Sequence, residues 1–368
     1  MLGAWLDRRL DALRREGLLR EPRSDGTDGA GAAADLSTND YLGLARRPVS
    51  RETPRGGAGA SRLLGGDRRE HAALEGASAA WVGLPAALAF SSGFAANVGL
   101  LGALAGPDVL VVSDAANHAS LIDGCRLGRS RVRVVPHLDA AAVAEALREP
   151  AALKLVAVES YYSMDADTPD LGRIREACDR VGAALIVDEA HALGVYGPRG
   201  AGVLRERGVD ADVVVGTYSK AVGAQGAFVA GQATLRAYLW NRARTFVFST
   251  GLSPALAAHA AANVRLAQAA EGPRSLLVAG AARVRAALTE AGLDVRGYGP
   301  IIPVVLGESA RTLAAAARLR ERGIVVSAVR PPTVPPGSSR LRLGLHAGLT
   351  DQNLDNTIAE VIAACRAS

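Results

Sequence analysis

Lysine is almost absent from this chain of 368 residues, which contains two lysines, Lys154 and Lys220, against forty arginines. Arginine is always protonated and cannot act as a nucleophilic amine, whereas a buried lysine can lose its proton and form a Schiff base with an aldehyde. A lysine that is kept in so arginine-rich a chain is therefore a candidate for chemistry that arginine cannot perform.

Cysteines and aromatic residues are also scarce. The three cysteines, Cys125, Cys178 and Cys365, are odd in number and lie far apart, which argues against a disulfide framework or a zinc site and predicts a reducing, cytoplasmic environment. Aromatic residues make up 4% of the chain and apolar residues 49%, so we expect a core built from Ala, Val and Leu. The length predicts two domains, or one large domain with an appendage.

Long apolar runs are missing as well. None approaches the roughly 20 residues that a membrane-spanning helix needs, and the first 23 residues alternate leucine with charged residues, so we expect neither a membrane span nor a signal peptide. The net charge is +5, but the arginines are scattered and no zinc-finger or RNA-binding pattern is present. We therefore expect no nucleic-acid partner.

Short β-branched runs alternate with helical segments from about residue 35 onward. The predicted strands are 109–112, 131–135, 154–158, 184–187 and 212–215, and the predicted helices between them include 139–147 and 170–181. Asp170 is a suitable N-cap for the second helix, and Gly182 is a suitable residue just after its end. This alternation predicts an α/β fold with a mostly parallel sheet covered by helices on both faces.

The two ends of the chain have a different pattern. Residues 5–20 are predicted as an amphipathic helix and residues 21–34 as a loop. A long Ala-rich helix is predicted from Pro254 to about Ala270. The remainder predicts a smaller α+β domain with strands 301–306, 324–329 and 340–345 and helices 309–322 and 351–366. We expect an N-terminal helix and arm (1–37), a large domain (38–262) and a small C-terminal domain (263–368).

Asp188 ends the apolar strand Ala-Leu-Ile-Val-Asp, at the place where doubly wound folds bind ligands. A carboxylate there can keep a pyridine nitrogen protonated, as pyridoxal 5′-phosphate (PLP) chemistry requires, and His191 lies close enough in sequence to reach the ring hydroxyl. The string Asp-Glu-Ala-His is also typical of a helicase Walker B motif. That alternative needs a Gly-x-x-x-x-Gly-Lys-Ser/Thr loop, which neither lysine provides. A purely structural aspartate remains the other interpretation.

Lys220 follows the next strand through Gly-Thr-Tyr-Ser, a run that begins with a small residue and lets the backbone approach a ligand closely. A lysine in that loop can reach a cofactor lying over the strand ends, and Thr217 can donate to its phosphate. The alternative is a solvated surface lysine. Lys154 opens an apolar strand, and we interpret it as a surface residue.

A phosphate group needs several donors, and the segment 91–97 can supply them. Ser-Ser-Gly-Phe-Ala-Ala-Asn leads from an apolar strand into a helical pattern, and a helix N-terminus presents free N–H groups to an anion. His118 follows another strand end, where its imidazole can stack on the pyridine ring or simply complete a loop. His71, His137 and His259 have no such context and are interpreted as structural.

Together these segments resemble the α-oxoamine synthases, a branch of the fold-type-I PLP-dependent enzymes. The resemblance covers nearly the whole chain up to Leu345, and it rests on segments 37–44, 59–66, 92–97, 117–121, 159–167, 187–191 and 216–221. It implies PLP as cofactor and a homodimer with active sites at its interface. Residues 45–58 are shorter than is usual in the family, and Ala192 stands where Gly or Ser is common, which affects the expected loop geometry.

The resemblance also implies roles for individual residues. Lys220 corresponds to the Schiff-base lysine, Asp188 to the pyridinium partner, His191 to the group at the ring hydroxyl, and His118 to the stacking histidine. The remaining cofactor contacts correspond to Gly93, Phe94, Ser163, Thr217 and, across the dimer, Thr250. The substrate positions correspond to Asn39, His118, Thr333, Arg342, which holds the amino-acid carboxylate, and Arg20, for which Arg14 is the competing alignment.

Within the family, the stretch 330–343, with its Arg-Pro-Pro, is most similar to members that act in biotin synthesis. The implied reaction joins L-alanine to a pimeloyl group carried on CoA or on acyl carrier protein, with loss of CO2. Two alternatives remain at this point. One is a glycine-using relative of the 2-amino-3-oxobutyrate CoA ligase or 5-aminolevulinate synthase type, and the other is a non-catalytic subunit with the same fold.

Overall fold

The computed structural model describes residues 2–19, 34–49 and 56–367 and divides the chain into two compact units. The larger unit comprises residues 39–162 and 167–275, and the smaller comprises 1–38, 163–166 and 276–368. Each unit is therefore assembled from segments that are distant in sequence. The division into residues 1–37, 38–262 and 263–368 stays a prediction.

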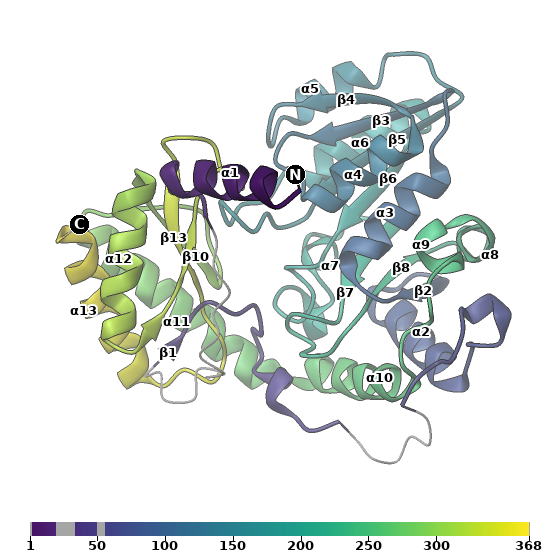
Figure 1. Ribbon diagram of the computed structural model, residues 1–368. Coiled ribbons are helices and arrows are strands. Elements are labelled where there is room, and N and C mark those ends of the chain that lie inside the picture. The colour runs from purple at the N-terminus through teal and green to yellow at the C-terminus, as the bar shows by residue number, and fades with distance from the viewer. Residues whose placement is uncertain (1, 20–33, 50–55, 368) are drawn as a thin grey trace. The chain divides into compact units, whose positions relative to one another are not determined.

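The larger unit contains a seven-stranded sheet with the strand order β2-β8-β7-β6-β5-β3-β4 (Figure 1). Strands β7, β6, β5, β3 and β4 are parallel, while β8 runs antiparallel to both of its neighbours. The bounds are β2 (Ala86–Phe90), β3 (Val109–Asp114), β4 (Arg131–Val135), β5 (Leu153–Glu159), β6 (Ala184–Asp188), β7 (Val213–Thr217) and β8 (Ala227–Gly231). The predicted mostly parallel α/β fold is confirmed.

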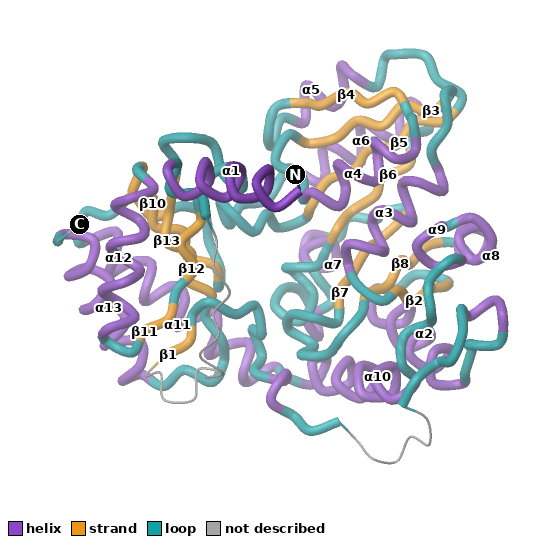
Figure 2. Tube along the Cα trace, viewed as in Figure 1, coloured by secondary structure: helices purple, strands orange, loops and turns teal. Residues whose placement is uncertain are grey.

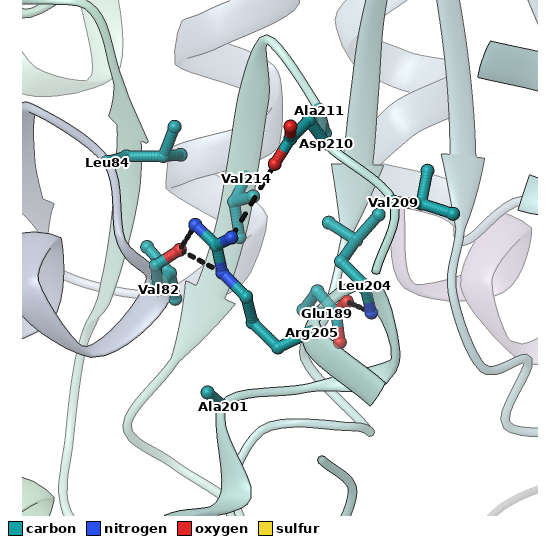
Figure 3. Close-up of a pocket in the computed structure, with 10 residues that line it drawn as sticks. All are labelled: Val82, Leu84, Glu189, Ala201, Leu204, Arg205, Val209, Asp210, Ala211 and Val214. Carbon is teal, nitrogen blue, oxygen red and sulfur yellow. Dashed lines mark hydrogen bonds and ion pairs between the residues drawn. The ribbon is translucent and has the colours of Figure 1, made fainter. Parts of the chain in front are cut away.

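Helices cover both faces of this sheet (Figure 2). They are α2 (Arg69–Val82), α3 (Gly93–Leu104), α4 (Ala119–Gly128), α5 (Ala140–Ala146), α6 (Leu171–Val181), α7 (Val203–Arg207), α8 (Ala233–Arg242), α9 (Arg244–Val247) and α10 (Pro254–Ala269). On one face, Leu100 of α3 and Leu121 of α4 pack against Val111 and Leu155 of the sheet. On the other, Val82 of α2 and Leu204 of α7 lie beside Val214 (Figure 3).

Local capping explains why α6 begins and ends where it does. The Asp170 carboxylate accepts a hydrogen bond from Arg173 N at 3.1 Å, and Gly182 adopts a left-handed conformation with φ 66° just after the last turn. A side-chain acceptor at the first position and a glycine after the last one are the features that favour these boundaries. The predicted cap residues of this helix are confirmed.

The smaller unit contains a four-stranded antiparallel sheet with the order β12-β13-β10-β9 and a two-stranded parallel pair, β1 with β11. The strands are β1 (Ala34–Asp35), β9 (Asp294–Val295), β10 (Ile301–Gly307), β11 (Ile324–Val325), β12 (Ser327–Val329) and β13 (Ser339–Gly344). Its helices are α1 (Leu2–Arg15), α12 (Ser309–Glu321), α13 (Asp351–Arg366) and most of α11 (Glu271–Glu290).

Two predicted elements differ from the observed ones. The predicted helix 5–20 is α1, Leu2–Arg15, and it ends early because Gly17 adopts φ 65° and the chain turns back to bond Leu13 O. The predicted strand 324–329 is split into β11 and β12, which pair in different sheets. None of the helices in the described part of the chain combines the length and the apolar character needed to span a bilayer.

Candidate active site

The candidate site lies at the carboxyl ends of the central parallel strands of the larger unit. Glu159, Asp188 and Thr217 are the last residues of β5, β6 and β7, respectively. Glu159 and Asp188 are direct partners across β5 and β6, so two carboxylates stand side by side at this edge. The ends of adjacent parallel strands are where this class of fold binds ligands.

Asp188 is buried, with 7% of its surface exposed, and both of its carboxylate oxygens are hydrogen-bonded. Asn97 Nδ2, from α3, donates to Oδ2 over 2.7 Å, and Ala190 N donates to Oδ1 over 2.9 Å. Asn97 Nδ2 also donates to Ser120 Oγ of α4 at 3.0 Å. These donors hold the Asp188 carboxylate in one orientation at the strand end.

His118 is the N-cap residue of α4, and Ser120 holds its imidazole ring. Ring atom Nδ1 lies 2.7 Å from Ser120 Oγ and accepts a hydrogen bond from Ser120 N at 3.2 Å. Desolvation lowers the pKa of His118, the Asp188 carboxylate opposes this effect, and the Lys220 ammonium adds to it. Asp188 and Lys220 therefore lie within electrostatic range of His118.

His191 is buried, with 7% of its surface exposed, in the loop that follows β6. Its Nδ1 lies 2.8 Å from the hydroxyl of Tyr41, which also donates to Asn39 Oδ1 at 3.3 Å. Asn39, a predicted substrate-side residue, is thereby connected to a predicted cofactor residue through Tyr41. All three residues belong to the larger unit.

The first turn of α3 lies close to Thr217. A Cβ atom placed on Gly93 would lie 3.9 Å from Thr217 Oγ1, and Ser92 Oγ accepts from Ala95 N at 3.1 Å. Phe94 is exposed, and the Thr217 hydroxyl donates to Gly226 O at 3.1 Å. The first N–H groups of a helix have no acceptor within the helix, so this turn offers donors to an anion. Thr250 is exposed and lies before Gly251, whose N–H donates to Ala60 O at 3.0 Å.

The residues present fit PLP. A buried, oriented carboxylate at the end of β6 suits a protonated pyridine nitrogen, and a glycine-led helix N-terminus beside a threonine hydroxyl suits a phosphate. Lys220 lies in the loop after β7, within electrostatic range of His118 and Glu159, where it can meet the aldehyde. The pyridine nitrogen, the phosphate and the aldehyde of the cofactor therefore each have a suitable partner in this unit.

The remaining predicted substrate residues lie in the smaller unit or outside the described residues. Arg342 of β13 is 5% exposed, and its Nε donates to Ser163 O at 2.8 Å. Thr333 is exposed and follows the cis peptide bond between Pro331 and Pro332. Arg20 lies outside the described residues. The competing residue Arg14 is exposed and forms an ion pair with Asp11 at 2.6 Å.

Sequence reasoning gave no role to three residues that the structure brings to this site, namely Asn97, Tyr41 and Glu159. Asn97 is the one strongly polar side chain in the otherwise apolar helix α3, and it is buried, with 2% of its surface exposed. An isolated polar residue on a buried helix is a usable signal for a hydrogen-bonding role. Tyr41 and Glu159 lie within the segments 37–44 and 159–167, but no local pattern distinguishes them.

A separate pocket lies on the face of the sheet that α2 and α7 cover, and none of the predicted cofactor residues lines it (Figure 3). In it, Arg205 donates to Val82 O at 2.7 Å and faces Asp210 at 3.5 Å. The Glu189 carboxylate accepts from Val203 N and Leu204 N at 3.0 and 2.8 Å, and burial raises the pKa of this group to about 7. These contacts cap α7, so we interpret the pocket as structural.

Comparison with known proteins places these observations in a family. The family model for aminotransferase class I and II matches residues 33–361. The chain is 46% identical to an 8-amino-7-oxononanoate synthase of Anaeromyxobacter dehalogenans, over 98% of the chain and 95% of the relative. It is 43% identical to one of Mycolicibacterium smegmatis, over 99% of the chain and 98% of the relative.

Solved structures give the same fold. A serine palmitoyltransferase of Sphingomonas wittichii superimposes with a TM-score of 0.91 at 31% identity, covering 98% of this chain and 96% of that one. An 8-amino-7-oxononanoate synthase of Francisella tularensis superimposes with a TM-score of 0.76 at 23% identity, covering 92% and 99%. At that identity, the second likeness supports the fold alone.

Proposed function

Because the chain belongs to the aminotransferase class I and II family and, within it, to the 8-amino-7-oxononanoate synthases, we propose that it condenses L-alanine with a pimeloyl thioester. The products are 8-amino-7-oxononanoate, CO2 and a free thiol, and the reaction belongs to biotin biosynthesis. The enzyme is a PLP-dependent acyltransferase. The observation that carries the proposal is the grouping of Lys220, Asp188 and His118 at one edge of the sheet.

PLP, when bound, supplies an electron sink that stabilises negative charge on the amino-acid α-carbon. We assign the chain's own residues as follows. Lys220 would hold the cofactor through its aldehyde, and its free amine would serve as the base for the α-proton of the substrate. Asp188 would keep the pyridine nitrogen protonated, and His191 would bond the ring hydroxyl. His118 would stack on the ring, and Gly93, Phe94, Ser163, Thr217 and the partner subunit's Thr250 would donate to the phosphate.

Arg342 is proposed to bind the carboxylate of alanine. Its guanidinium direction is set by the 2.8 Å bond from Nε to Ser163 O, and the planar fork matches a carboxylate better than a point charge does. Asn39, Thr333 and Arg20 complete the substrate side. Contribution of Thr250 to a neighbouring site requires a homodimer, and we propose that assembly together with a cytoplasmic location.

The first test asks whether Lys220 holds PLP. Wild-type protein with PLP is expected to absorb near the edge of the visible range, and borohydride reduction is expected to fix PLP to the peptide that contains Lys220, as mass spectrometry would detect. Lys220→Ala is expected to give no reducible adduct. Lys154→Arg is the matched control, because Lys154 bonds Leu147 O at 2.7 Å, away from the site, and should give a normal adduct. A reducible adduct in Lys220→Ala would refute the assignment.

The second test concerns the substrates. Thiol release is measured with alanine, glycine or serine against pimeloyl, acetyl, succinyl or palmitoyl thioesters, and alanine with pimeloyl thioester is expected to be fastest. Pimeloyl-CoA and pimeloyl-acyl carrier protein are compared side by side to identify the donor. Faster turnover of glycine with a short acyl thioester would replace this assignment with a glycine-using relative. PLP binding without any turnover would favour a non-catalytic subunit.

A further inference from the structure

Glu159 is a buried carboxyl group at the centre of the candidate site, and the roles proposed above do not use it. It ends β5, is 6% exposed, and is the direct cross-strand partner of Asp188. A carboxyl group is costly to bury without partners, so its contacts indicate why it is there.

The principal contact of Glu159 is with the backbone of His118. Glu159 Oε1 accepts a hydrogen bond from His118 N at 2.7 Å, which is a short distance for an N–H···O bond. His118 N belongs to the N-cap residue of α4, and the ring of the same residue is held by Ser120. The backbone of His118 is thus fixed by Glu159, and its imidazole by Ser120.

The charges around Glu159 come from three other segments. Burial raises the pKa of Glu159 to about 8, and the carboxylates of Asp188 and, more weakly, Asp114 act in the same direction. The Lys220 ammonium and the His118 N–H oppose them and favour the ionised form. The contact with His118 therefore lies inside the electrostatic network that contains Lys220 and Asp188.

We propose that Glu159 is a positioning residue for His118: its carboxyl oxygen anchors the start of α4 and so places the imidazole where it can stack on the cofactor. The expected effect on the cofactor rests on the proposed PLP-dependent function. The hydrogen bond between His118 N and Glu159 Oε1 does not depend on that function. The essential feature is an acceptor oxygen at this position. Glutamine retains such an oxygen without the negative charge, whereas alanine removes it.

The first experiment measures the dissociation constant of PLP from the apoenzyme by absorbance titration. Glu159→Ala is expected to weaken binding about tenfold, within the range for losing one hydrogen bond, and Glu159→Gln to stay within about threefold of wild type, because glutamine keeps the acceptor oxygen. Asp139→Ala is the matched control. It removes an exposed carboxylate that accepts Ala142 N at 2.9 Å at the start of α5 and is not a predicted cofactor contact, so it should leave PLP binding unchanged.

The second experiment needs no cofactor. NMR of histidine-labelled apoenzyme follows the titration of the His118 ring, with His259 as an internal reference. Glu159→Ala is expected to move the pKa of His118 up toward the ordinary imidazole value as the ring becomes more solvated, while Glu159→Gln and Asp139→Ala leave it in place. A general loosening of the fold would shift the pKa values of both His118 and His259. If Glu159→Ala does not fold, Glu159→Gln still tests the role, because a shifted His118 pKa in that variant would contradict it.

These outcomes separate the inference from the proposed function. Wild-type protein that fails to bind PLP would refute the proposed function, while the NMR titration would still test the contact. Wild-type PLP affinity and an unmoved His118 titration in Glu159→Ala would overturn the positioning role. Equal damage from glutamine and alanine would also overturn it, because the negative charge rather than the acceptor oxygen would then be responsible.

Discussion

Asn97 Nδ2 donates hydrogen bonds to Asp188 Oδ2 at 2.7 Å and to Ser120 Oγ at 3.0 Å. Since Ser120 Oγ lies 2.7 Å from His118 Nδ1, a continuous chain of hydrogen bonds connects the proposed pyridinium partner with the proposed stacking histidine. The chain joins β6, α3 and α4 and fixes the relative position of two groups that must meet the same ring. Such networks hold catalytic groups in place before the ligand arrives.

Asn97→Ala is expected to impair both stability and cofactor binding. The variant leaves Asp188 without its side-chain donor, and losing a hydrogen bond to a buried charged group costs about 1.5–3 kcal/mol of unfolding free energy. PLP binding should weaken about tenfold, as measured by absorbance titration. Asn241→Ala removes an exposed amide that bonds Ala237 O and serves as control. Unchanged PLP affinity in Asn97→Ala would argue against a role for this network.

Tyr41→Phe tests whether the tyrosine hydroxyl orients His191. The substitution keeps the ring, which is fully buried, and deletes the oxygen that lies 2.8 Å from His191 Nδ1. We expect a loss of about 1 kcal/mol in unfolding free energy, measured by urea denaturation, and a shift in the absorbance spectrum of bound PLP. Tyr238→Phe, whose hydroxyl donates to Ala103 O near the surface, should leave the spectrum unaltered. An absorbance spectrum of Tyr41→Phe identical to that of wild type would mean that the Tyr41 hydroxyl does not influence the bound cofactor.

Local patterns in the sequence predicted most of the sheet. Strand β4 has the predicted bounds, Arg131–Val135, and α13 begins and ends as expected, because β-branched runs and helical periodicity are properties of neighbouring residues. Strand β8 was not predicted. Its run of small and apolar residues is short, and its antiparallel place between β2 and β7 depends on pairing with distant segments.

The candidate site was predictable to the extent that motifs carry chemistry. Lys220, Asp188 and His118 follow recognisable strand ends, and the structure brings them into one electrostatic network. Their supporting residues were not predictable, because Tyr41 and His191 are 150 residues apart and Glu159 meets His118 across 41 residues. Such contacts follow from topology, which a single sequence does not display. His137, which we interpreted as structural, lies between the carboxylates of Asp114 and Asp167, and these contacts also follow from the topology.

Asp165→Asn is expected to destabilise the smaller unit. Arg340 is 1% exposed, and its guanidinium forms a 2.6 Å ion pair with Asp165, which Arg296 also contacts at 3.2 Å. Removing the negative partner leaves a buried charge, and we expect a loss of about 3 kcal/mol in unfolding free energy. Glu145→Gln breaks the exposed pair with Arg148 and should change stability by less than about 1 kcal/mol. Equal effects of the two substitutions would contradict this account.

His137 is expected to make stability depend on pH above neutrality. Its Nδ1 lies 2.8 Å from Asp114 Oδ1, and its Nε2 lies 3.2 Å from Asp167 Oδ2. Burial alone lowers the pKa of His137, but the hydrogen bonds and charges of the two carboxylates outweigh burial and raise it to about 10. The folded protein therefore retains the proton over a range in which the unfolded chain, with an imidazole pKa near 6.5, releases it.

The sign of the effect follows from this difference. The stabilisation by protonated His137 is fully present below about pH 6.5 and is lost as the pH rises towards 10. The difference in unfolding free energy between wild type and His137→Gln should thus be about 3–5 kcal/mol at pH 6 and should shrink steadily up to pH 10, as urea denaturation at several pH values would measure. Asn241→Ala, which removes no titratable group, is the control and should give a difference without this slope. A constant difference between wild type and His137→Gln would mean that the glutamine variant loses packing, and that the imidazolium between Asp114 and Asp167 does not stabilise the fold.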